Sequence, residues 1–477
     1  MSSLALIIHA HFYQPPREDP LSGEIPVEAG AAPYDNWNER IHAECYRPNA
    51  EAGNFERVSF NLGPTLAAWM QRHDPETLAR ITAQDRANVE RYGTGNALAQ
   101  PYNHTILPLA PYRDKVTQVR WGIADFEHRF GRRPRGMWLP EAAVDTETLM
   151  VLAEHGIEFT ILAPWQANTP LLDPSEPYWV SLPGGKRIAV FFYHGELSAR
   201  ISFDGDMTLN ADAFAAGELL PRFNNAKKYR REPQMLLLAS DGELYGHHKP
   251  DRDKFLAYLT RHSAPANGIE ITYPARWLDE HPPRKTIPLR YDTSWSCHHG
   301  LSRWAAGCSC TPGDSSWKGA LRSAFNLLAS ELDEVYYAYM ARLTRNPWAL
   351  RDRYIEVVLG KTTTAALLAE FDIPPLSPQE IRRVEWMLIA QYERQRMFTS
   401  CGWFFEDYDR IEPKNNTAYA AQAVWMVYQA TGIDLSEYAV RELRYVSSQR
   451  GNIRGDQVFL QHLVRAQTSA YQMPQHA

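Results

Sequence analysis

The strongest constraint on the fold is a series of short apolar runs that alternate with helical stretches through about the first 285 residues. They show little alternation of apolar and polar residues, which is typical of strands buried on both faces. Such strand–helix alternation, repeated about seven times, predicts a parallel α/β barrel or a doubly wound sheet. The runs are rich in Ile, Leu, Val and Phe and cover residues 4–10, 58–62, 136–139, 159–163, 189–193, 235–240 and 269–273.

Three helices in this part have explicit start and stop signals. Each is predicted to begin at an aspartate, whose carboxylate accepts from the first free amides, and to end at a glycine. The pairs are Asp74 with Gly93, Asp114 with Gly131, and Asp145 with Gly156. A different pattern in residues 178–194 predicts a hairpin that turns at Gly184 and Gly185.

After about residue 310 the apolar residues follow helical spacing, and no strong strand pattern interrupts them. We therefore predict a barrel domain over 1–285 and a mainly α-helical domain over 286–477, which would complete the active-site cleft. The pair Pro282-Pro283 marks the boundary. The predicted helices cover residues 320–343, 347–368, 378–398, 417–431 and 435–446.

Composition excludes several classes of protein. The net charge of −6 provides no basic surface for a nucleic acid. No apolar run approaches the roughly 18 residues that span a bilayer, and the run at 4–8 has neither a basic lead nor a small-residue cleavage site. Five cysteines, an odd number, indicate reduced thiols. We therefore expect a cytoplasmic protein without a membrane or nucleic-acid partner.

Titratable side chains follow the predicted strands, where a parallel α/β fold gathers its active site. Glu141 directly follows GMWLP, and Asp241 directly follows MLLLAS. Flanking apolar residues would partly desolvate both, which separates the pKa values of neighbouring carboxyls. Two carboxyls in one cleft are the minimum for glycoside hydrolysis, although capping of helices or pairing with Arg would also explain them. The other candidates at strand ends are His9, His11, Gln14, His104, His194, Glu243 and His248.

The motifs HAHFYQPP, GMWLPEAAVD, SDGELYGHH and MFTSCGWFFED resemble those of glycoside hydrolase family 57, which contains α-amylases, amylopullulanases, 4-α-glucanotransferases and glucan branching enzymes. The likeness extends over most of the chain and includes TSWSCHHG. It implies a distorted (β/α)7-type parallel barrel followed by an α-helical domain, and a retaining mechanism. It also implies that Glu141 is the nucleophile and Asp241 the general acid/base.

From these observations we predict a retaining glycosidase or transferase that acts on α-glucans, with α-1,4 linkages, and needs no cofactor or catalytic metal. A branching enzyme and a 4-α-glucanotransferase remain alternatives. A retaining pair of carboxyls should lie about 5–5.5 Å apart. His9, His11 and His104 would bind sugar hydroxyls, and Gln14, His194, Glu243 and His248 would also contact substrate.

Two tryptophans within the motifs, Trp138 and Trp403, are predicted to stack on the sugar. A helix ending at Gly402 would leave Trp403 free to project towards the barrel, close to a sugar at Glu141. The alternative is that Trp403 holds the two domains together. A sugar-stacking wall could also include Trp165, Trp295, Trp304 and Trp317. For any single tryptophan, packing in the core is the more common role.

Two metal sites are also compatible with the sequence. His9 and His11 share one face of a strand and, with Asp241, would suit a metal-dependent polysaccharide deacetylase or amidohydrolase. Cys297-His298-His299 and Cys308-x-Cys310 offer thiolate and imidazole ligands that suit structural zinc. Free cysteines in a compact loop are the alternative for this second group.

Overall fold

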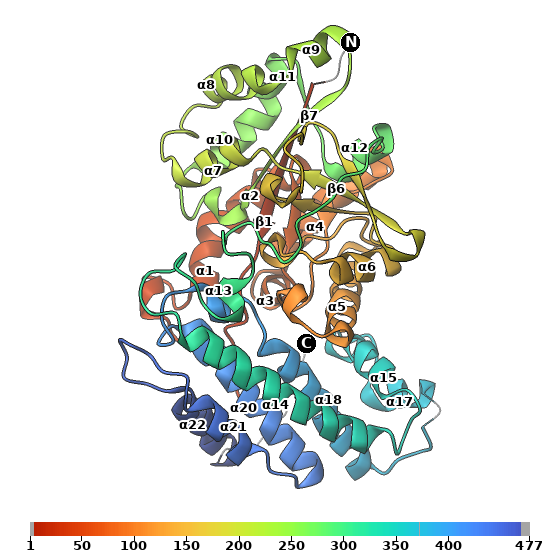
Figure 1. Ribbon diagram of the computed structural model, residues 1–477, viewed down its shortest axis with the longest axis vertical. Helices are drawn as coiled ribbons and strands as arrows, with labels where there is room; N and C mark the ends of the chain where they lie inside the picture. Colours follow the sequence, from red (N-terminus) through yellow and green to blue (C-terminus); the bar gives the residue numbers. More distant parts are fainter. Residues whose placement is uncertain (1–3, 372, 469–477) are drawn as a thin grey trace. The chain divides into compact units, whose positions relative to one another are not determined.

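The computed structural model describes residues 4–371 and 373–468, and the chain forms two compact units (Figure 1). The first unit contains the residues up to Gln14, Val27–Pro101 and Phe126–Trp295. The second contains Pro15–Pro26, Tyr102–Asp125 and the residues from Ser296 onward. The chain thus leaves the first unit for the last time between residues 295 and 296. The sequence predicts the domain boundary between residues 285 and 286. The segments Pro15–Pro26 and Tyr102–Asp125 also belong to the second unit. A single boundary in the sequence would have placed both of them in the first unit.

The first unit is built on parallel strands around β1 (Leu4–Phe12). One edge of β1 pairs with β7 (Gln234–Asp241), and the other pairs with β2 (Ser59–Leu62) and, at residues 4–6, with β8 (Ile269–Ile271). Next to β2 lies β3 (Ala97–Leu98). The nearly complete burial of β1 and β7 agrees with their unbroken apolar runs.

The ring of strands continues from β3 to β7 through short bridges. Ala99 bridges to Met137, and Gly136 bridges to β4 (Phe159–Leu162), which pairs in parallel with β6 (Arg187–Phe192). The His194 amide then donates to the Leu237 carbonyl on β7 at 2.7 Å. Within the described residues, β1, β2, β3, the segment around Met137, β4, β6 and β7 thus form the seven parallel segments of a distorted (β/α)7 barrel, as predicted.

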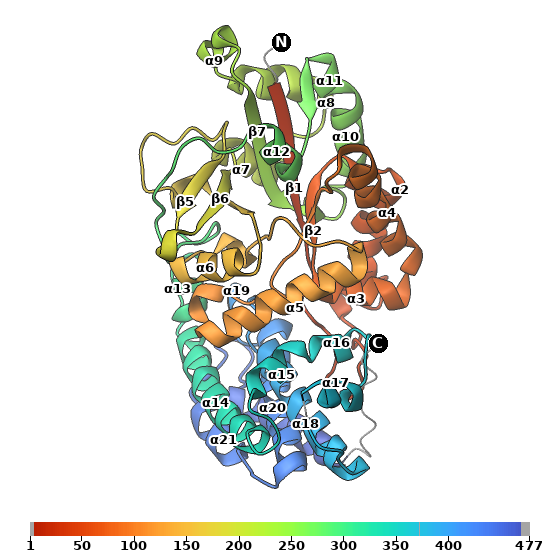
Figure 2. The same cartoon turned by 90° about the vertical axis from the view of Figure 1, so that its right-hand side faces the viewer.

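The strand β5 (Tyr178–Ser181) pairs antiparallel with β6, which confirms the predicted hairpin. Helices lie outside the strands of this unit (Figure 2). The longer ones are α3 (Pro64–His73), α4 (Pro75–Tyr92), α6 (Thr146–Glu154), α7 (Gly195–Phe203), α10 (Arg252–Tyr258) and α12 (Pro274–Glu280). Shorter helices are α1 (Trp37–Ile41), α2 (Arg47–Glu51), α8 (Ala211–Phe214), α9 (Asn225–Arg230) and α11 (Ala264–Ala266).

Two of the three predicted helix starts are confirmed. Asp74 accepts from the Thr77 amide at 3.0 Å to cap α4, which ends at Gly93 with φ 76°. Asp145 caps α6 in the same way. The start at Asp114 is wrong, because α5 (Tyr112–Phe130) begins two residues earlier. The carboxylate of Asp114 binds buried guanidinium groups instead of capping its helix.

The second unit is helical, as predicted. Helix α18 (Pro378–Arg396) packs closely on α20 (Ile411–Thr431), which packs on α22 (Gly455–Thr468), a helix the sequence analysis did not predict. The predicted helix at 347–368 is wrong: it is divided into α15 (Pro347–Arg353), α16 (Ile355–Val358) and α17 (Thr364–Glu370), with Gly360 at φ 67° between the last two. The remaining helices are α13 (Ser302–Ala305), α14 (Trp317–Met340), α19 (Cys401–Phe404) and α21 (Ser436–Leu443). No helix among the described residues is long and apolar enough to cross a membrane.

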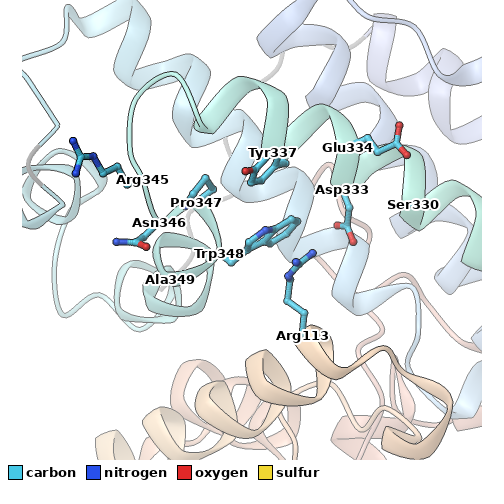
Figure 3. A pocket seen from close by; sticks show the side chains of 10 residues that line it. All are labelled: Arg113, Ser330, Asp333, Glu334, Tyr337, Arg345, Asn346, Pro347, Trp348 and Ala349. Carbon is cyan, nitrogen blue, oxygen red and sulfur yellow. The ribbon is translucent and has the colours of Figure 1, made fainter.

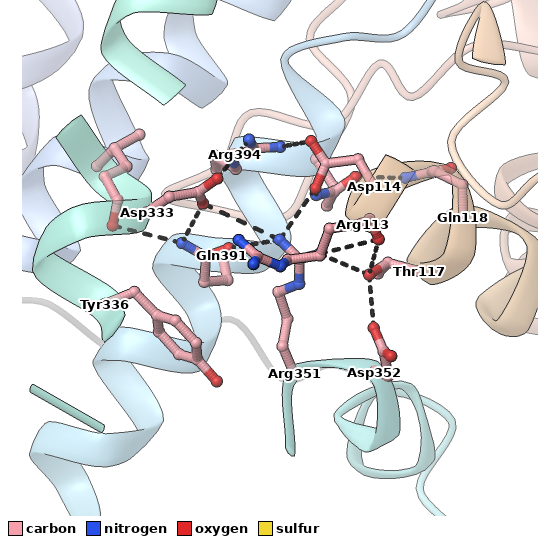
Figure 4. Close-up of polar contacts among 12 residues, drawn as sticks. Arg113, Asp114, Thr117, Gln118, Asp333, Tyr336, Arg351, Asp352, Gln391 and Arg394 are labelled. Carbon is pink, nitrogen blue, oxygen red and sulfur yellow. Dashed lines mark hydrogen bonds and ion pairs between the residues drawn. The ribbon is translucent and has the colours of Figure 1, made fainter. Parts of the chain in front are cut away.

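A buried ionic network joins helices within the second unit (Figure 4). Asp114 binds Arg351 at 3.0 Å, Gln395 at 2.8 Å, and Arg394. Arg394 also binds Asp333 at 2.8 Å. Burial alone would raise the pKa of Asp114, but Arg394 and Arg351 together hold it below its usual value. The carboxylate therefore remains charged and, together with Asp333, balances the charge of two guanidinium groups that water does not reach.

We predict that Asp114→Asn lowers the free energy of unfolding by about 3–5 kcal/mol, because it leaves buried positive charge without its partner. Urea titration of the variant and wild type measures this difference. Since the pKa of Asp114 is lowered by folding, the difference should be fully present above about pH 5 and shrink as the pH falls below about 4. Glu76→Gln, which breaks an exposed pair with Arg80, is the control and should leave the free energy of unfolding nearly unchanged, because solvent screens such pairs. A similar small cost for both variants would contradict the prediction.

Candidate active site

Glu141 lies in a strained turn at the end of the segment that contains Met137. Its φ is 57°, and Ala142 follows with φ 48°, both in the left-handed region that non-glycine residues rarely adopt. Such conformations persist where neighbouring contacts hold them, and they concentrate at functional sites. Here the Trp295 amide donates to the Glu141 carbonyl at 2.9 Å. The backbone of Trp295 thus helps to fix the conformation that aims the Glu141 side chain.

The side chain of Trp295 binds Glu141 as well. Its indole Nε1 donates to Oε2 of the carboxylate at 3.0 Å. A donor to the charged form of a carboxyl favours ionisation. The sequence analysis considers Trp295 only as a possible sugar-stacking ring, and it did not predict this hydrogen bond to Glu141, although the residue lies in the quoted motif TSWSCHHG.

Asp241 is the last residue of β7, in register with His11 on β1. The side chain of Asp241 is exposed to water at the end of the strand. The protein that surrounds it nevertheless reduces the solvation of the charged form, which raises the pKa of Asp241 to about 7. The negative charge of Glu141 adds to this effect. Glu141 is thus near enough to Asp241 for its charge to act on the pKa of that residue, and the roles of the two carboxyls in catalysis stay a prediction.

His9 and His11 lie on the adjacent strand and are buried. Ring nitrogen Nδ1 of His9 is 3.0 Å from Ser59 Oγ, and Nδ1 of His11 is 3.1 Å from Asn61 Oδ1. Burial, followed for His9 by the proximity of His11, lowers the pKa of His9 to about 3, and burial lowers that of His11 to about 4. Both rings are therefore neutral near pH 7. His11 donates from Nδ1 to the amide oxygen, which assigns Nε2 as an acceptor.

Trp138 packs behind these histidines, with ring centroids 4.7 Å from His9 and 5.4 Å from His11. Its exposed fraction is 0%. A ring without an exposed face cannot stack on a sugar, so the predicted stacking role of Trp138 is not supported. Trp295, whose ring centroid is 4.9 Å from that of Trp138, is half-buried, and Trp165 is 43% exposed. These two rings are the better candidates for stacking.

Gln14 and Glu243 are buried, and both form a hydrogen bond with the hydroxyl group of Tyr46. The Tyr46 hydroxyl donates to Glu243 at 2.6 Å, and Gln14 Nε2 donates to that hydroxyl at 3.1 Å. The Tyr13 amide donates to the same carboxyl at 3.1 Å. Burial raises the pKa of Glu243 to about 8. These contacts indicate that both side chains hold the loop after Asp241, and their contact with substrate stays a prediction.

Two further histidines lie in loops of the first unit. His194 caps α7, where its Nδ1 accepts from the Leu197 amide at 3.3 Å. His248 is exposed, with its ring centroid 4.8 Å from that of His247. Their proposed contact with substrate stays a prediction.

His104 and Trp403 belong to the second unit. His104 is buried, with Nδ1 2.6 Å from Ser400 Oγ. Trp403 is 0% exposed and donates from Nε1 to the Lys318 carbonyl at 3.1 Å, with the Arg322 guanidinium 3.9 Å from its ring. The predicted helix end at Gly402 is wrong, since α18 ends at Arg396 and Gly402 lies within the one-turn α19. Trp403 is therefore packed inside its own unit and has no free face for a sugar.

The metal-dependent alternative is not favoured. Among the described residues, the cluster of histidine, cysteine and acidic side chains that could hold a metal ion contains Cys297, His299, Cys308 and Cys310. It does not contain the set of His9, His11 and Asp241 that a deacetylase or amidohydrolase would need.

A depression of about 680 Å³ lies in the second unit and contains none of the predicted site residues (Figure 3). At its wall the rings of Tyr337 and Trp348 stack with centroids 6.2 Å apart, and the Arg113 guanidinium lies 3.8 Å from the Trp348 ring. These partners already occupy the faces of Trp348. Its lining consists of Arg113, Ser330, Asp333, Glu334, Tyr337, Arg345, Asn346, Pro347, Trp348 and Ala349.

We predict that Asp241→Asn removes a pH dependence of stability between about pH 4 and 7. Folding raises the pKa of Asp241 from 3.8 to about 7, so the folded state binds the proton more tightly in this window. Stability of the wild type should therefore fall as the pH rises through the window. Urea titrations at pH 4, 5.5, 7 and 8 should show the variant gaining on the wild type with increasing pH. Asp206→Asn, at an exposed carboxyl, is the control, and a constant difference for Asp241→Asn would contradict the prediction.

Comparisons with known proteins identify the family. Residues 21–290, more than half of the chain, match the family model described as Glycosyl hydrolase family 57. Residues 314–477 match a model described as a domain of unknown function (DUF3536). Alpha-amylase 1 of Dictyoglomus thermophilum is 26% identical over 192 residues, which are 40% of this chain and 26% of that protein.

Two further similarities agree with this match. A 4-alpha-glucanotransferase of Thermococcus litoralis is 25% identical over 171 residues, 35% of this chain and 25% of that protein. The chain thus spans about a quarter of the length of these curated relatives. An exo-type maltose-forming amylase from Pyrococcus sp. ST04 has the same fold, with a TM-score of 0.73 at 17% identity over 92% of this chain and 82% of that one. With its barrel and carboxyl pair, the chain belongs to glycosyl hydrolase family 57.

Proposed function

We propose that this protein is a retaining enzyme that cleaves α-1,4 linkages of α-glucans through a covalent glycosyl-enzyme intermediate. The observation that carries the proposal is the proximity of Glu141 to Asp241: poor solvation, and then the nearby charge of Glu141, raise the pKa of Asp241 to about 7. Retaining glycosidases need one ionised carboxylate as nucleophile and one protonated carboxyl as acid. The hydrogen bond from Trp295 to Glu141 supports the assignment of Glu141 as the anion.

In the first step, an oxygen of Glu141 attacks the anomeric carbon while the bond to the leaving oxygen breaks. Asp241 transfers its proton to that oxygen, so the shortened glucan leaves with a free hydroxyl. In the second step, ionised Asp241 removes a proton from water or from a glucan hydroxyl. The resulting oxygen attacks the anomeric carbon and displaces Glu141. Two inversions restore the α-configuration and return Asp241 to its protonated form.

Neutral His9 and His11 fit this chemistry. Imidazolium groups beside Glu141 and Asp241 would lower the pKa of Asp241 and remove its proton at neutral pH. Neutral rings leave its raised pKa in place. His9 Nε2 has no hydrogen-bond partner among the described residues, but His9 is as completely buried as Trp138, so its contact with a sugar hydroxyl stays a prediction.

Transfer to a glucan acceptor is the second candidate, and the similarity to a 4-alpha-glucanotransferase favours it. Hydrolysis and transfer share the first step and differ in which hydroxyl enters the second. A branching enzyme would direct the same intermediate to a 6-hydroxyl group.

The five cysteines within the described residues form no disulfide. Reduced cysteines support a reducing compartment such as the cytoplasm as the place of action.

Incubation of the pure protein with maltooligosaccharides, amylose and aryl α-glycosides, followed by chromatography, tests the substrate class. We predict shorter α-glucans, longer transfer products or new branch points, and no product at all from Glu141→Gln. Failure of the wild type to convert any α-glucan, or turnover by Glu141→Gln, would contradict the proposal.

Asp241→Asn separates the two roles in the same assay. Substrates with a good leaving group need little protonation, so their cleavage should suffer less than that of a natural glucan. Azide needs no base to attack the intermediate, and its addition should yield an α-glycosyl azide. Equal and unrescued loss in both variants would contradict the assigned roles.

We predict that Trp295→Phe lowers kcat/KM by about 10- to 100-fold, because it removes a hydrogen bond to a charged group that is worth about 1.5–3 kcal/mol. The phenyl ring keeps aromatic contact with Trp138. The acidic limb of the pH–rate profile should move to higher pH, since the carboxylate of Glu141 loses a donor. Trp179→Phe, at a partly buried ring packed on the barrel core, is the control. An unchanged profile for Trp295→Phe would show that the indole does not tune Glu141.

A further inference from the structure

We propose that the second unit holds a structural zinc ion between Cys297, His299, Cys308 and Cys310. One ligand atom of each residue lies within 4.8 Å of those of the other three. Three thiols and an imidazole form one of the ligand sets that structural zinc sites use.

The distances agree with tetrahedral coordination. Two Zn–S bonds of about 2.3 Å at the tetrahedral angle place the sulfur atoms about 3.8 Å apart, and a shorter Zn–N bond gives about 3.6 Å between nitrogen and sulfur. Cys297 Sγ lies 3.5 Å from Cys308 Sγ and 3.8 Å from Cys310 Sγ, and His299 Nδ1 lies 3.3 Å from Cys310 Sγ. The four side chains thus surround a space of the size that the ion requires.

Two tight turns present the ligands in pairs. The first pair, Cys297 and His299, lies in a turn closed by the Gly300 amide, which donates to the Cys297 carbonyl at 3.2 Å. The second pair, Cys308 and Cys310, follows Gly307, whose φ is 92°. A Cβ at Gly307 would lie 2.4 Å from the Ser315 carbonyl oxygen. The close backbone approach that brings the second pair into place therefore requires glycine.

The charge of the surroundings suits the bound ion. Zn²⁺ with three thiolates and a neutral imidazole has a net charge of −1. The ammonium group of Lys318 is buried and interacts electrostatically with Cys308 and Cys297. It also donates to Thr311 Oγ1, next to Cys310 in sequence, at 3.2 Å. A buried cation is thus matched to the excess negative charge of the filled site.

The role is structural, since four protein ligands leave no position for water or substrate. The ion would hold together the loop segments at 297–300 and 307–311, which lie on either side of α13 and precede α14. The proposal is independent of the catalytic function, because none of the four residues belongs to the carboxyl site.

Elemental analysis of wild-type protein purified under reducing conditions should find about one zinc per chain. After removal of zinc, titration with Co²⁺ should produce the visible bands of tetrahedral Co²⁺ and sulfur-to-metal charge transfer, saturating at one equivalent. Two adjacent exposed histidines provide matched variants. His299→Ala should lose most of the zinc and weaken Co²⁺ binding, whereas His298→Ala should retain both.

Cys308→Ser and Cys401→Ser form the second matched pair, and only the first should reduce metal content and melting temperature. Measurements on the wild type do not depend on the folding of any variant. A wild type that binds neither zinc nor Co²⁺ would overturn the proposal. A disulfide between two of the three cysteines that persists during purification with a reductant would also overturn it. Equal metal content in His299→Ala and wild type would do the same.

Discussion

The parallel pairing of β1 with β7 is the constraint on which the carboxyl site depends. Backbone hydrogen bonds fix the register that sets His11 beside Asp241. On its other edge β1 pairs with β2, so that His9 and His11 align with Ser59 and Asn61, their hydrogen-bond partners. A slip of one residue would turn every one of these side chains to the opposite face.

The two carboxyls lie in different electrostatic surroundings. Asp241 is poorly solvated and lies near the charge of Glu141, whereas Glu141 receives a hydrogen bond from Trp295. The strained conformation of Glu141 is held by the same tryptophan through its backbone. Residue 295 thus acts on both the position and the charge of Glu141, and aromatic packing through Trp138 connects it to the histidines.

The second unit relies on buried polar groups to a similar degree. Asp114, Arg351 and Arg394 form a network that water does not reach, and Trp403 packs against Arg322 in the same unit. Isolated buried charges are costly, and here Asp114 and Asp333 supply the opposite charge for Arg351 and Arg394. The proposed zinc site follows the same rule, with Lys318 as the matching cation.

The sequence by itself predicted most of the barrel strands and several helix ends, because these follow from local apolar runs and capping residues, and its motifs indicated two candidate carboxyls. Only the tertiary structure decided the rest. It showed that Trp138 and Trp403 are buried, that Asp114 pairs with arginines about 240 and 280 residues away, and that Trp295 binds Glu141. Burial and partners depend on contacts between segments far apart in the chain, and no local pattern specifies which segments will meet.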